Sequence, residues 1–214
     1  MVIKTSTFFI SASICDCSIF TIDHVTFSFS SGIRGIKKEN ELEIESVLAR
    51  IRLGDRKAFA EVVMRFQKPL FGFLGRMGLS QAVCEEIAQE TFVRAWISLG
   101  RYDPAISMFS TWIYTIARNL ALNELGKAAK RLEISGESLP EHPCEAHPAE
   151  SMNRLQQALL KLDPSDRSIL ALAYVEGMAQ SEIAQMEGCS KGAVKVRIHR
   201  AKQKLKAFLE KDDE

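Results

Sequence analysis

From Lys38 onward, apolar residues recur at intervals of three and four positions, and no alternating apolar–polar pattern appears. Such spacing places side chains on one face of an α-helix, whereas a half-buried strand needs strict alternation. The stretch FSTWIYTIARNLALNEL, residues 109–125, is representative. We therefore predict an all-α fold. The apolar stripe of this stretch consists of Phe109, Trp112, Ile113, Ile116, Ala117, Leu120 and Ala121.

Four helices are predicted in the first half of the chain. They cover about residues 41–52, a segment that opens near Asp55 and is kinked at Pro69, about 80–99, and 109 to about 127. Each has an apolar face that must be buried against another element. We expect them to form one compact helical domain over residues 38–129.

Residues 130–150 change the character of the chain. The segment KRLEISGESLPEHPCEAHPAE holds three prolines and few apolar residues, which is typical of a flexible linker. His142, Cys144 and His147 lie within it and are possible metal ligands, but no fourth ligand is near them in sequence. We favour a solvated linker and expect neither a metal nor a cofactor. Helical spacing resumes at Ser151, which predicts a second helical domain over residues 151–210.

The segment QSEIAQMEGCSKGAVKVRIHRAKQKLK has the layout of a helix-turn-helix. Gly188 permits the turn, and Ser190 can cap the second helix. We expect Ile183, Ala184, Val194 and Ile198 to pack the two helices together, and Cys189 to be a small packed side chain rather than a reactive thiol. The outward face then presents Lys195, Val196, His199, Arg200 and Gln203, side chains suited to the major groove of DNA.

Charge is distributed unevenly along the chain. Residues 188–209 contain seven Lys or Arg and no Asp or Glu, although the net charge of the whole chain is only +1. A basic block behind a mildly acidic body indicates a polyanion partner at one end and a different partner elsewhere, with a solvated basic helix as the alternative.

Two sets of motifs together resemble the bacterial RNA polymerase sigma factors of the extracytoplasmic-function (ECF) group. The segments AFAEVVMRFQKPLFGFL, EEIAQETFVRAW and FSTWIYTIARNLALNEL resemble the family's region 2, and residues 159–206 resemble its region 4. The resemblance covers roughly residues 42–209, and the family's region 3 is absent between the two. It implies a sigma factor that binds core RNA polymerase and directs promoter recognition and transcription initiation, and that is not an enzyme.

The resemblance also implies roles for matching positions. The partners it implies are core RNA polymerase, through its clamp helices and flap, promoter DNA and an anti-sigma factor. The implied polymerase face comprises Glu86, Gln89, Glu90 and Arg94. The implied contacts to the minus-ten element are Tyr102, Trp112, Thr115 and Asn119. The implied contacts to the minus-thirty-five element are Ser190, Lys191, Lys195, Val196, Arg197, His199, Arg200 and Gln203.

The sequence departs from the family pattern at three places. Ala179 stands where a Ser or Thr cap is usual, so the helix either loses that cap or starts later at Ser181. Val196 replaces a small polar residue, cannot donate a hydrogen bond, and is expected to touch a thymine methyl. The loop RYDPAISMF is slightly longer than in some members, so minus-ten specificity is not transferable.

For the minus-ten contact we expect capture of an unpaired base rather than unassisted melting. Opening five stacked steps costs on the order of 7 kcal/mol at about 1.4 kcal/mol per step, whereas one aromatic stack returns only about 1–3 kcal/mol. We predict that Tyr102 and its loop line a pocket for a flipped base, whose edge Asn119 would bind. Trp112 belongs either to the core stripe or to this edge.

Residues 1–37 contain few charges and are expected to be a poorly ordered extension, with a mis-called start codon or a genuine secretory leader as alternatives. No apolar run is long enough to span a membrane. Five irregularly spaced cysteines favour a reducing cytoplasm over a disulfide scaffold. The rival functions are a stand-alone helix-turn-helix activator and an enzyme, but no catalytic triad, phosphate loop or metal set is evident.

Overall fold

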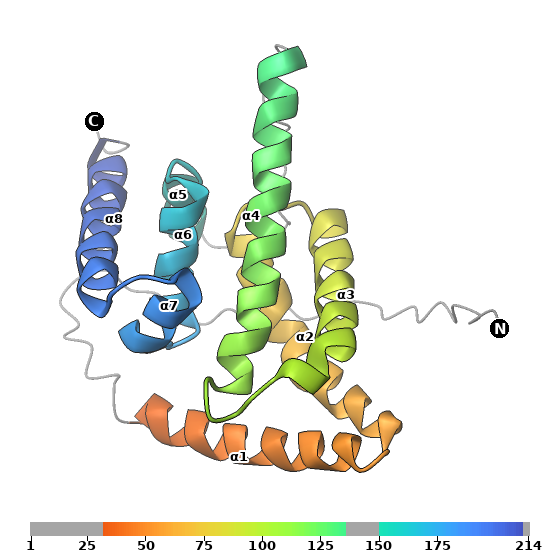
Figure 1. The fold of residues 1–214 in the computed structure, drawn as a ribbon. Coiled ribbons are helices and arrows are strands. Elements are labelled where there is room, and N and C mark those ends of the chain that lie inside the picture. Colours follow the sequence, from red (N-terminus) through yellow and green to blue (C-terminus); the bar gives the residue numbers. More distant parts are fainter. Residues whose placement is uncertain (1–31, 136–149, 212–214) are drawn as a thin grey trace.

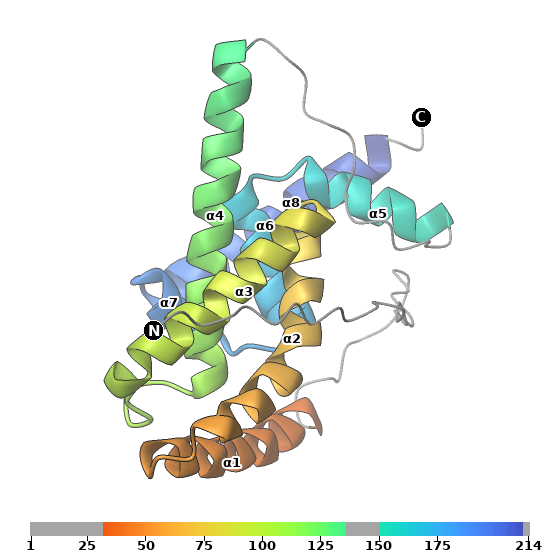
Figure 2. The ribbon, with the colours of Figure 1, turned by 90° about the vertical axis from the view of Figure 1, so that its right-hand side faces the viewer.

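The computed structural model of the chain describes residues 32–135 and 150–211, with side chains described for 42–131 and 154–210. Every regular element in these two ranges is a helix, which confirms the all-α prediction (Figures 1 and 2). The metal-ligand candidates His142, Cys144 and His147, and the predicted extension up to residue 31, lie outside the described residues.

The first domain is a bundle of four helices with a buried aromatic and aliphatic core. Phe73, Phe109, Leu48 and Ile113 are fully buried in it, and Phe66 packs edge-on against Phe109. Short 3-10 turns at Arg56–Ala58 and Leu99–Arg101 lead into the second helix and out of the third. The helices are α1 (Gly32–Arg52), α2 (Phe59–Arg76), α3 (Gln81–Ser98) and α4 (Phe109–Ser135).

The predicted helices exist, but two are longer than predicted. Helix α1 begins at Gly32 instead of near residue 41, and α4 continues to Ser135, well into the segment predicted as linker. Helix α3 follows Ser80, the predicted N-cap residue, although no hydrogen bond to its side chain forms. Pro69 lies inside α2, which continues on both sides of it.

The second domain contains α5 (Glu150–Leu160), α6 (Pro164–Leu170), α7 (Gln180–Glu187) and α8 (Lys191–Lys211). Its last two helices form the predicted helix-turn-helix, but Cys189, which was expected to be packed, is exposed in the turn. Ile183, Val194 and Ile198 are buried between them. Gly188 adopts φ +63, in the left-handed region that glycine tolerates best. The Ser190 hydroxyl accepts a hydrogen bond of 3.1 Å from the Ala193 amide, so this cap is confirmed.

A π-helical turn follows α6. It covers Ala171–Val175, and the amide of Glu176 donates to the carbonyl of Ala171, five residues back, at 3.0 Å. Such turns hold one more residue than the α-helical geometry would, and they are frequent at functional sites. Gly177, at φ +62, ends the segment. The periodicity of the sequence did not predict this turn.

The two domains pack against each other and share one continuous hydrophobic core. In Figure 1, α4 stands between α3 on one side and α6 and α7 on the other. Helix α4 contacts both α6 and α7, and α2 contacts the π-helical turn. The sequence predicted two domains and a connecting linker, but not this contact between them.

Candidate promoter and polymerase interfaces

Helix α8 presents the predicted reader surface to solvent. Ser190 caps it, and its side chains Lys191, Lys195, Val196, His199, Arg200 and Gln203 are exposed. Because buried Val194, Ile198 and Ala201 hold the opposite face, the exposed side chains project away from the domain. A shallow groove along this face is lined by Asp166, Gly192, Ala193, Val196, Arg197, Arg200 and Lys204. Val196 is 50% exposed, so an apolar group of a bound molecule can reach it.

Arg197 differs from the other predicted reader residues because it is already engaged within the protein. Its guanidinium contacts the carboxylates of Glu187 and Asp166 and the hydroxyl of Ser165. Asp166 also accepts a hydrogen bond of 2.7 Å from Lys204. Arg197 is thus held at the base of α8, where it is half-buried.

Ala179 occupies the N-cap position of α7, so the alternative start at Ser181 is not used. The Ala179 amide donates to the Glu182 carboxylate at 2.6 Å, which supplies one half of a capping box. The other half, a side-chain oxygen at the cap, is missing because alanine has none. Glu182 also accepts a hydrogen bond of 3.1 Å from the Thr111 hydroxyl on α4.

The predicted base pocket near Tyr102 is closed in this structure. Tyr102 is 5% exposed, and its ring centroid lies 5.3 Å from those of both Phe109 and Trp112. Its hydroxyl lies 2.6 Å from a carboxylate oxygen of Glu45 and 3.1 Å from the carbonyl of Ser107. The Tyr102 ring therefore forms the floor beneath Trp112, and a base could stack on it only if the loop moved.

Trp112, Thr115 and Asn119 form a strip along α4. Asn119 is exposed, whereas Trp112 and Thr115 are half-buried. The core side of the helix, Ile113, Ala117 and Ala121, is fully buried. The sequence left open whether Trp112 belongs to the core stripe or to the edge that faces DNA. Its ring packs on Tyr102 and Phe109 and still reaches the surface, so Trp112 belongs to both.

The predicted polymerase face of α3 is open to solvent. Glu86, Gln89 and Arg94 are exposed, and Glu90 is half-buried and pairs with Arg94 at 2.6 Å. Helical spacing places Val93 and Ile97 on this same face. These two apolar side chains are 51% and 76% exposed, and exposed apolar clusters mark protein interfaces. Neither residue was predicted from the sequence, although their spacing from Glu86 and Gln89 could have identified them.

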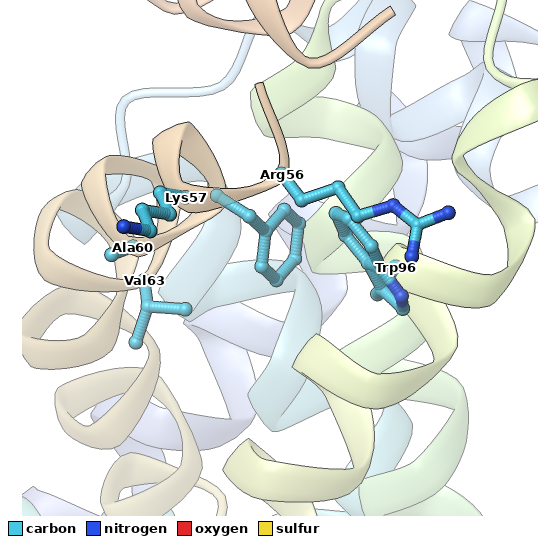
Figure 3. A pocket seen from close by; sticks show the side chains of 6 residues that line it. Arg56, Lys57, Ala60, Val63 and Trp96 are labelled. Atoms are coloured by element: carbon cyan, nitrogen blue, oxygen red, sulfur yellow. The ribbon is translucent and has the colours of Figure 1, made fainter. Parts of the chain in front are cut away.

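A hollow between the start of α2 and the end of α3 adjoins this face (Figure 3). Phe59 packs edge-on against Trp96 within it, with ring centroids 5.0 Å apart. Arg56 and Lys57 stand at its rim. The hollow is apolar inside and basic at the edge, which is complementary to an apolar side chain next to acidic groups.

The contact between the two domains, which we call the interdomain seam, adds buried and half-buried polar contacts to the shared hydrophobic core. Glu187 of α7 is its centre: its carboxylate accepts a hydrogen bond of 2.5 Å from Arg118 of α4 and another from Arg197 of α8. The Glu187 and Arg118 side chains are 6% and 9% exposed. Burial lowers the pKa of Arg118, and the nearby Glu187 carboxylate opposes that shift.

A second polar cluster of the seam gathers around Glu176, directly after the π-helical turn. Its carboxylate accepts a hydrogen bond of 2.8 Å from Arg76 of α2 and another from the hydroxyl of Tyr114 of α4. Burial raises the pKa of Tyr114 well above its usual range, and the charge of Glu176 adds to the shift. Near the loop, the Gln185 side chain donates to the carbonyl of Ile106 at 2.8 Å.

Arg167 of α6 is the most buried cation of the seam, at 6% exposure. Its guanidinium donates to the carbonyl of Met77 at the end of α2, and to the carbonyls of Leu160 and Leu162 in its own domain. Burial lowers the pKa of Arg167. Gly78 lies directly against this guanidinium. Apart from Arg197, none of the side chains that make these polar seam contacts was singled out from the sequence.

Among the described residues, no group of three or more His, Cys, Asp or Glu side chains is placed to hold a metal ion. No helix in the described ranges is both long and apolar enough to cross a membrane.

Comparison with known proteins found matches to both domains. The family model Sigma-70 region 2 matches residues 62–131, and Sigma-70, region 4 matches residues 152–205. The ECF RNA polymerase sigma factor SigW of Bacillus subtilis (strain 168) is 30% identical over 79% of this chain and 98% of its own length. RNA polymerase sigma factor CarQ of Myxococcus xanthus is 33% identical over 76% of this chain and 95% of its own.

Solved structures agree with these matches. CnrH, in a complex with the cytosolic domain of CnrY, is 30% identical to this chain, with a TM-score of 0.60 over 78% of this chain and 96% of CnrH. The sigma factor RpoE of Bartonella quintana, in a complex with the anti-sigma factor NepR, shares the fold at 23% identity and a TM-score of 0.60, over 72% of this chain and 98% of RpoE.

Proposed function

This chain belongs to the sigma-70 family of RNA polymerase sigma factors, in the ECF group, and from that premise we propose how its two domains share promoter recognition. As a sigma factor it acts with core RNA polymerase in promoter recognition and transcription initiation. The observation that carries this function is the order of the two matches along one chain, region 2 followed by a region 4 that ends in the basic helix α8.

In this proposal, α8 reads the minus-thirty-five element from the major groove. Lys195, His199 and Arg200 supply contacts to phosphates and base edges, and Val196 supplies an apolar contact to a thymine methyl. The exposure of these side chains on one face of a helix-turn-helix supports the assignment. Ser190, Lys191 and Gln203 extend the same face toward the ends of the helix, and Arg197 joins it once its bonds to Glu187 and Asp166 are released.

The minus-ten element is assigned to the strip of α4. Asn119 is exposed and can bind the edge of an unpaired base, and Trp112 offers a half-buried ring on which a base can stack. Thr115 lies between them and is half-buried. Tyr102 supports Trp112 from below, and it becomes part of the pocket itself only if the loop 103–108 opens.

The polymerase face is assigned to α3. Its polar contacts come from Glu86, Gln89, Glu90 and Arg94. At the end of the face, the exposed side chains of Val93 and Ile97 provide apolar area that a bound partner would cover. Helix α3 lies on the opposite side of α4 from α7 and α8 (Figure 1), so a partner bound to α3 leaves the reader helix free. We assign the clamp helices of the polymerase to this face, and the flap to region 4.

We also propose that the chain has no catalytic activity of its own, because bond formation belongs to the polymerase, and that it works in the cytoplasm, where polymerase and chromosome meet. An anti-sigma factor is a further partner, since the Bartonella quintana RpoE was solved in a complex with the anti-sigma factor NepR.

Run-off transcription tests this function. The purified chain is added to core RNA polymerase on fragmented genomic DNA, and the 5′ ends of the transcripts are sequenced. We expect a small set of new start sites that share one sequence pair at the minus-ten and minus-thirty-five positions. The same start sites with and without the chain would refute the function.

Two variants assign the interfaces. Glu86→Arg combined with Glu90→Arg should abolish co-purification with core polymerase, while far-UV circular dichroism stays unchanged because Glu86 is exposed and the pair that Glu90 forms with Arg94 lies at the surface. Asn119→Ala should retain polymerase binding and slow open-complex formation on the mapped promoter. Unchanged open-complex formation by Asn119→Ala would remove Asn119 from the minus-ten site.

A further inference from the structure

Helix α8 carries a charge that by itself would bind DNA of any sequence. Residues 188–209 hold seven Lys or Arg and no Asp or Glu. Lysines and arginines bind phosphates regardless of the bases, and each phosphate contact adds about 0.9 to the slope of log affinity against log salt. Such contacts compete with the promoter, because a genome offers about 10⁶–10⁹ non-specific sites. A group that restrains these cations therefore affects promoter recognition.

A carboxylate on another helix reaches two of these cations. Asp166 lies on α6, and its oxygens lie 3.4 Å from Nε of Arg197 and 2.7 Å from Nζ of Lys204. Arg197 and Lys204 are about two helical turns apart, so they lie on one side of α8. Val196 and Arg200 of the reader surface line the same groove as these three residues. The Asp166 carboxylate thus lies beside the surface that is proposed to face DNA.

Asp166 is a fixed charge, whereas the cations around it are accessible. Its side chain is 14% exposed, and those of Arg197 and Lys204 are 34% and 55% exposed. The first turn of α6 is itself held in place, because the Ser165 amide donates to the side chain of Asp163 at 2.9 Å. A phosphate that approached Lys204 would come close to the Asp166 carboxylate, and like charges repel more strongly where water is partly excluded. DNA must therefore compete with Asp166 for these two cations.

We propose that Asp166 acts as an internal substitute for a DNA phosphate: its carboxylate holds Arg197 and Lys204 and lowers the affinity of region 4 for DNA of any sequence. The proposal rests on the proposed function, since it concerns the helix assigned to the minus-thirty-five element. Lys204 carries most of the effect, because Arg197 is also held by Glu187. With two cations withheld from phosphates, promoter binding depends more on the base contacts of the reader surface.

Asp166→Asn tests the proposal. It removes the charge, keeps the size of the side chain and leaves Lys204 available to a phosphate. Binding of the full chain to a labelled duplex without a promoter is measured by fluorescence anisotropy at several salt concentrations. One additional phosphate contact should steepen the slope of log affinity against log salt by about 0.9. The gain in affinity should then be roughly 3.5-fold larger at 50 mM than at 200 mM salt, which is about 0.9 powers of a fourfold change.

Lys204→Ala completes a double-mutant cycle. In the wild-type background it should leave the slope unchanged, because Asp166 already occupies Lys204. In the Asp166→Asn background it should remove the added 0.9 or so. The matched control for net charge is Glu210→Gln. Glu210 lies 3.4 Å from Lys206, and their side chains are 64% and 76% exposed. Such an exposed pair contributes little, so Glu210→Gln should leave the slope unchanged.

An unchanged slope for Asp166→Asn would overturn the proposal. A loss of affinity would also overturn it, because Asp166 would then orient Lys204 toward DNA. An equally steep slope for Glu210→Gln would assign the effect to net charge instead. Lys204 is exposed, so should Asp166→Asn fail to fold, Lys204→Ala alone still decides: a shallower slope in the wild-type background refutes the withheld cation, and an unchanged slope supports it.

These assays use neither polymerase nor promoter, so their outcome is independent of the run-off assay. A chain that drives transcription but shows the same slope with and without the Asp166 carboxylate refutes the role of Asp166 alone. A chain that shows the expected slopes but drives no transcription refutes the proposed function alone.

Discussion

Gly78 offers the sharpest test of how the two domains are held together. It adopts φ +82 at the end of α2, and a Cβ placed there would lie 2.3 Å from Nη1 of Arg167 and 2.5 Å from Cδ2 of Leu160. Both clashing groups belong to the second domain. Gly78→Ala must therefore push Arg167 away from the carbonyl of Met77 or move the domains apart.

The cost of Gly78→Ala has two parts. A left-handed conformation costs a residue with a Cβ about 1–2 kcal/mol. The loss of one hydrogen bond from a charged donor adds about 1.5–3 kcal/mol. We expect the free energy of unfolding to fall by about 2.5–5 kcal/mol in total, from the sum of these two effects.

Gly54→Ala is the matched control for this prediction. Gly54 has φ +105 but nothing within 4 Å of the added Cβ, so it should lose only the backbone part, about 1–2 kcal/mol. Urea unfolding followed by far-UV circular dichroism measures both variants. If both variants lost the same free energy of unfolding, Arg167 could move away from the added methyl group without destabilising the protein. The buried hydrogen bond from Arg167 to Met77 would then not stabilise the contact between the domains.

Three further predictions concern the helix-turn-helix. Ala179→Ser supplies the side-chain oxygen that the capping box opposite Glu182 lacks, so the free energy of unfolding in urea titrations should rise by about 1 kcal/mol. No gain would mean that water already satisfies the amides of the first turn of α7. Lys195→Ala should weaken binding to all promoter sequences similarly and reduce the slope of log affinity against log salt by about 1 in fluorescence anisotropy, whereas an unchanged slope would exclude a phosphate contact. When thymines of the minus-thirty-five element are replaced with uracil one at a time, one replacement should weaken DNA binding by the wild-type protein and leave DNA binding by Val196→Ala unchanged. An equal loss of affinity in both proteins would exclude the methyl contact.

The sequence predicted those parts of the fold that depend on local spacing. The helix-turn-helix was located correctly because Gly188 and Ser190 are needed at fixed offsets, and because Ile183, Val194 and Ile198 mark the buried face. The all-α architecture followed from the same periodicity. The π-helical turn could not be predicted, since the segment ends at Gly177 shortly after it and no helical apolar pattern follows in which a shifted phase would appear.

The seam and the closed base pocket were not predictable in this way. Arg118 and Arg167 look like solvated charges in the sequence, yet their buried partners lie on other helices and belong largely to the other domain. Tyr102 looked available to a base, but the carboxylate of Glu45, distant in sequence, holds its hydroxyl. Contacts between distant segments decide each of these cases, and periodicity carries no information about them.

The π-helical turn at Ala171–Val175 makes the chain sensitive to length at one point. Removing a single residue there would restore α-helical geometry and rotate all that follows by about 100° relative to α6. Glu176 would turn away from Arg76 and Tyr114, and α7 would approach α4 with a different face. Substitutions in this segment can be absorbed one side chain at a time, but a one-codon deletion would misalign both helices of the helix-turn-helix. Insertions and deletions at Ala171–Val175 should therefore disturb the structure far more than substitutions do.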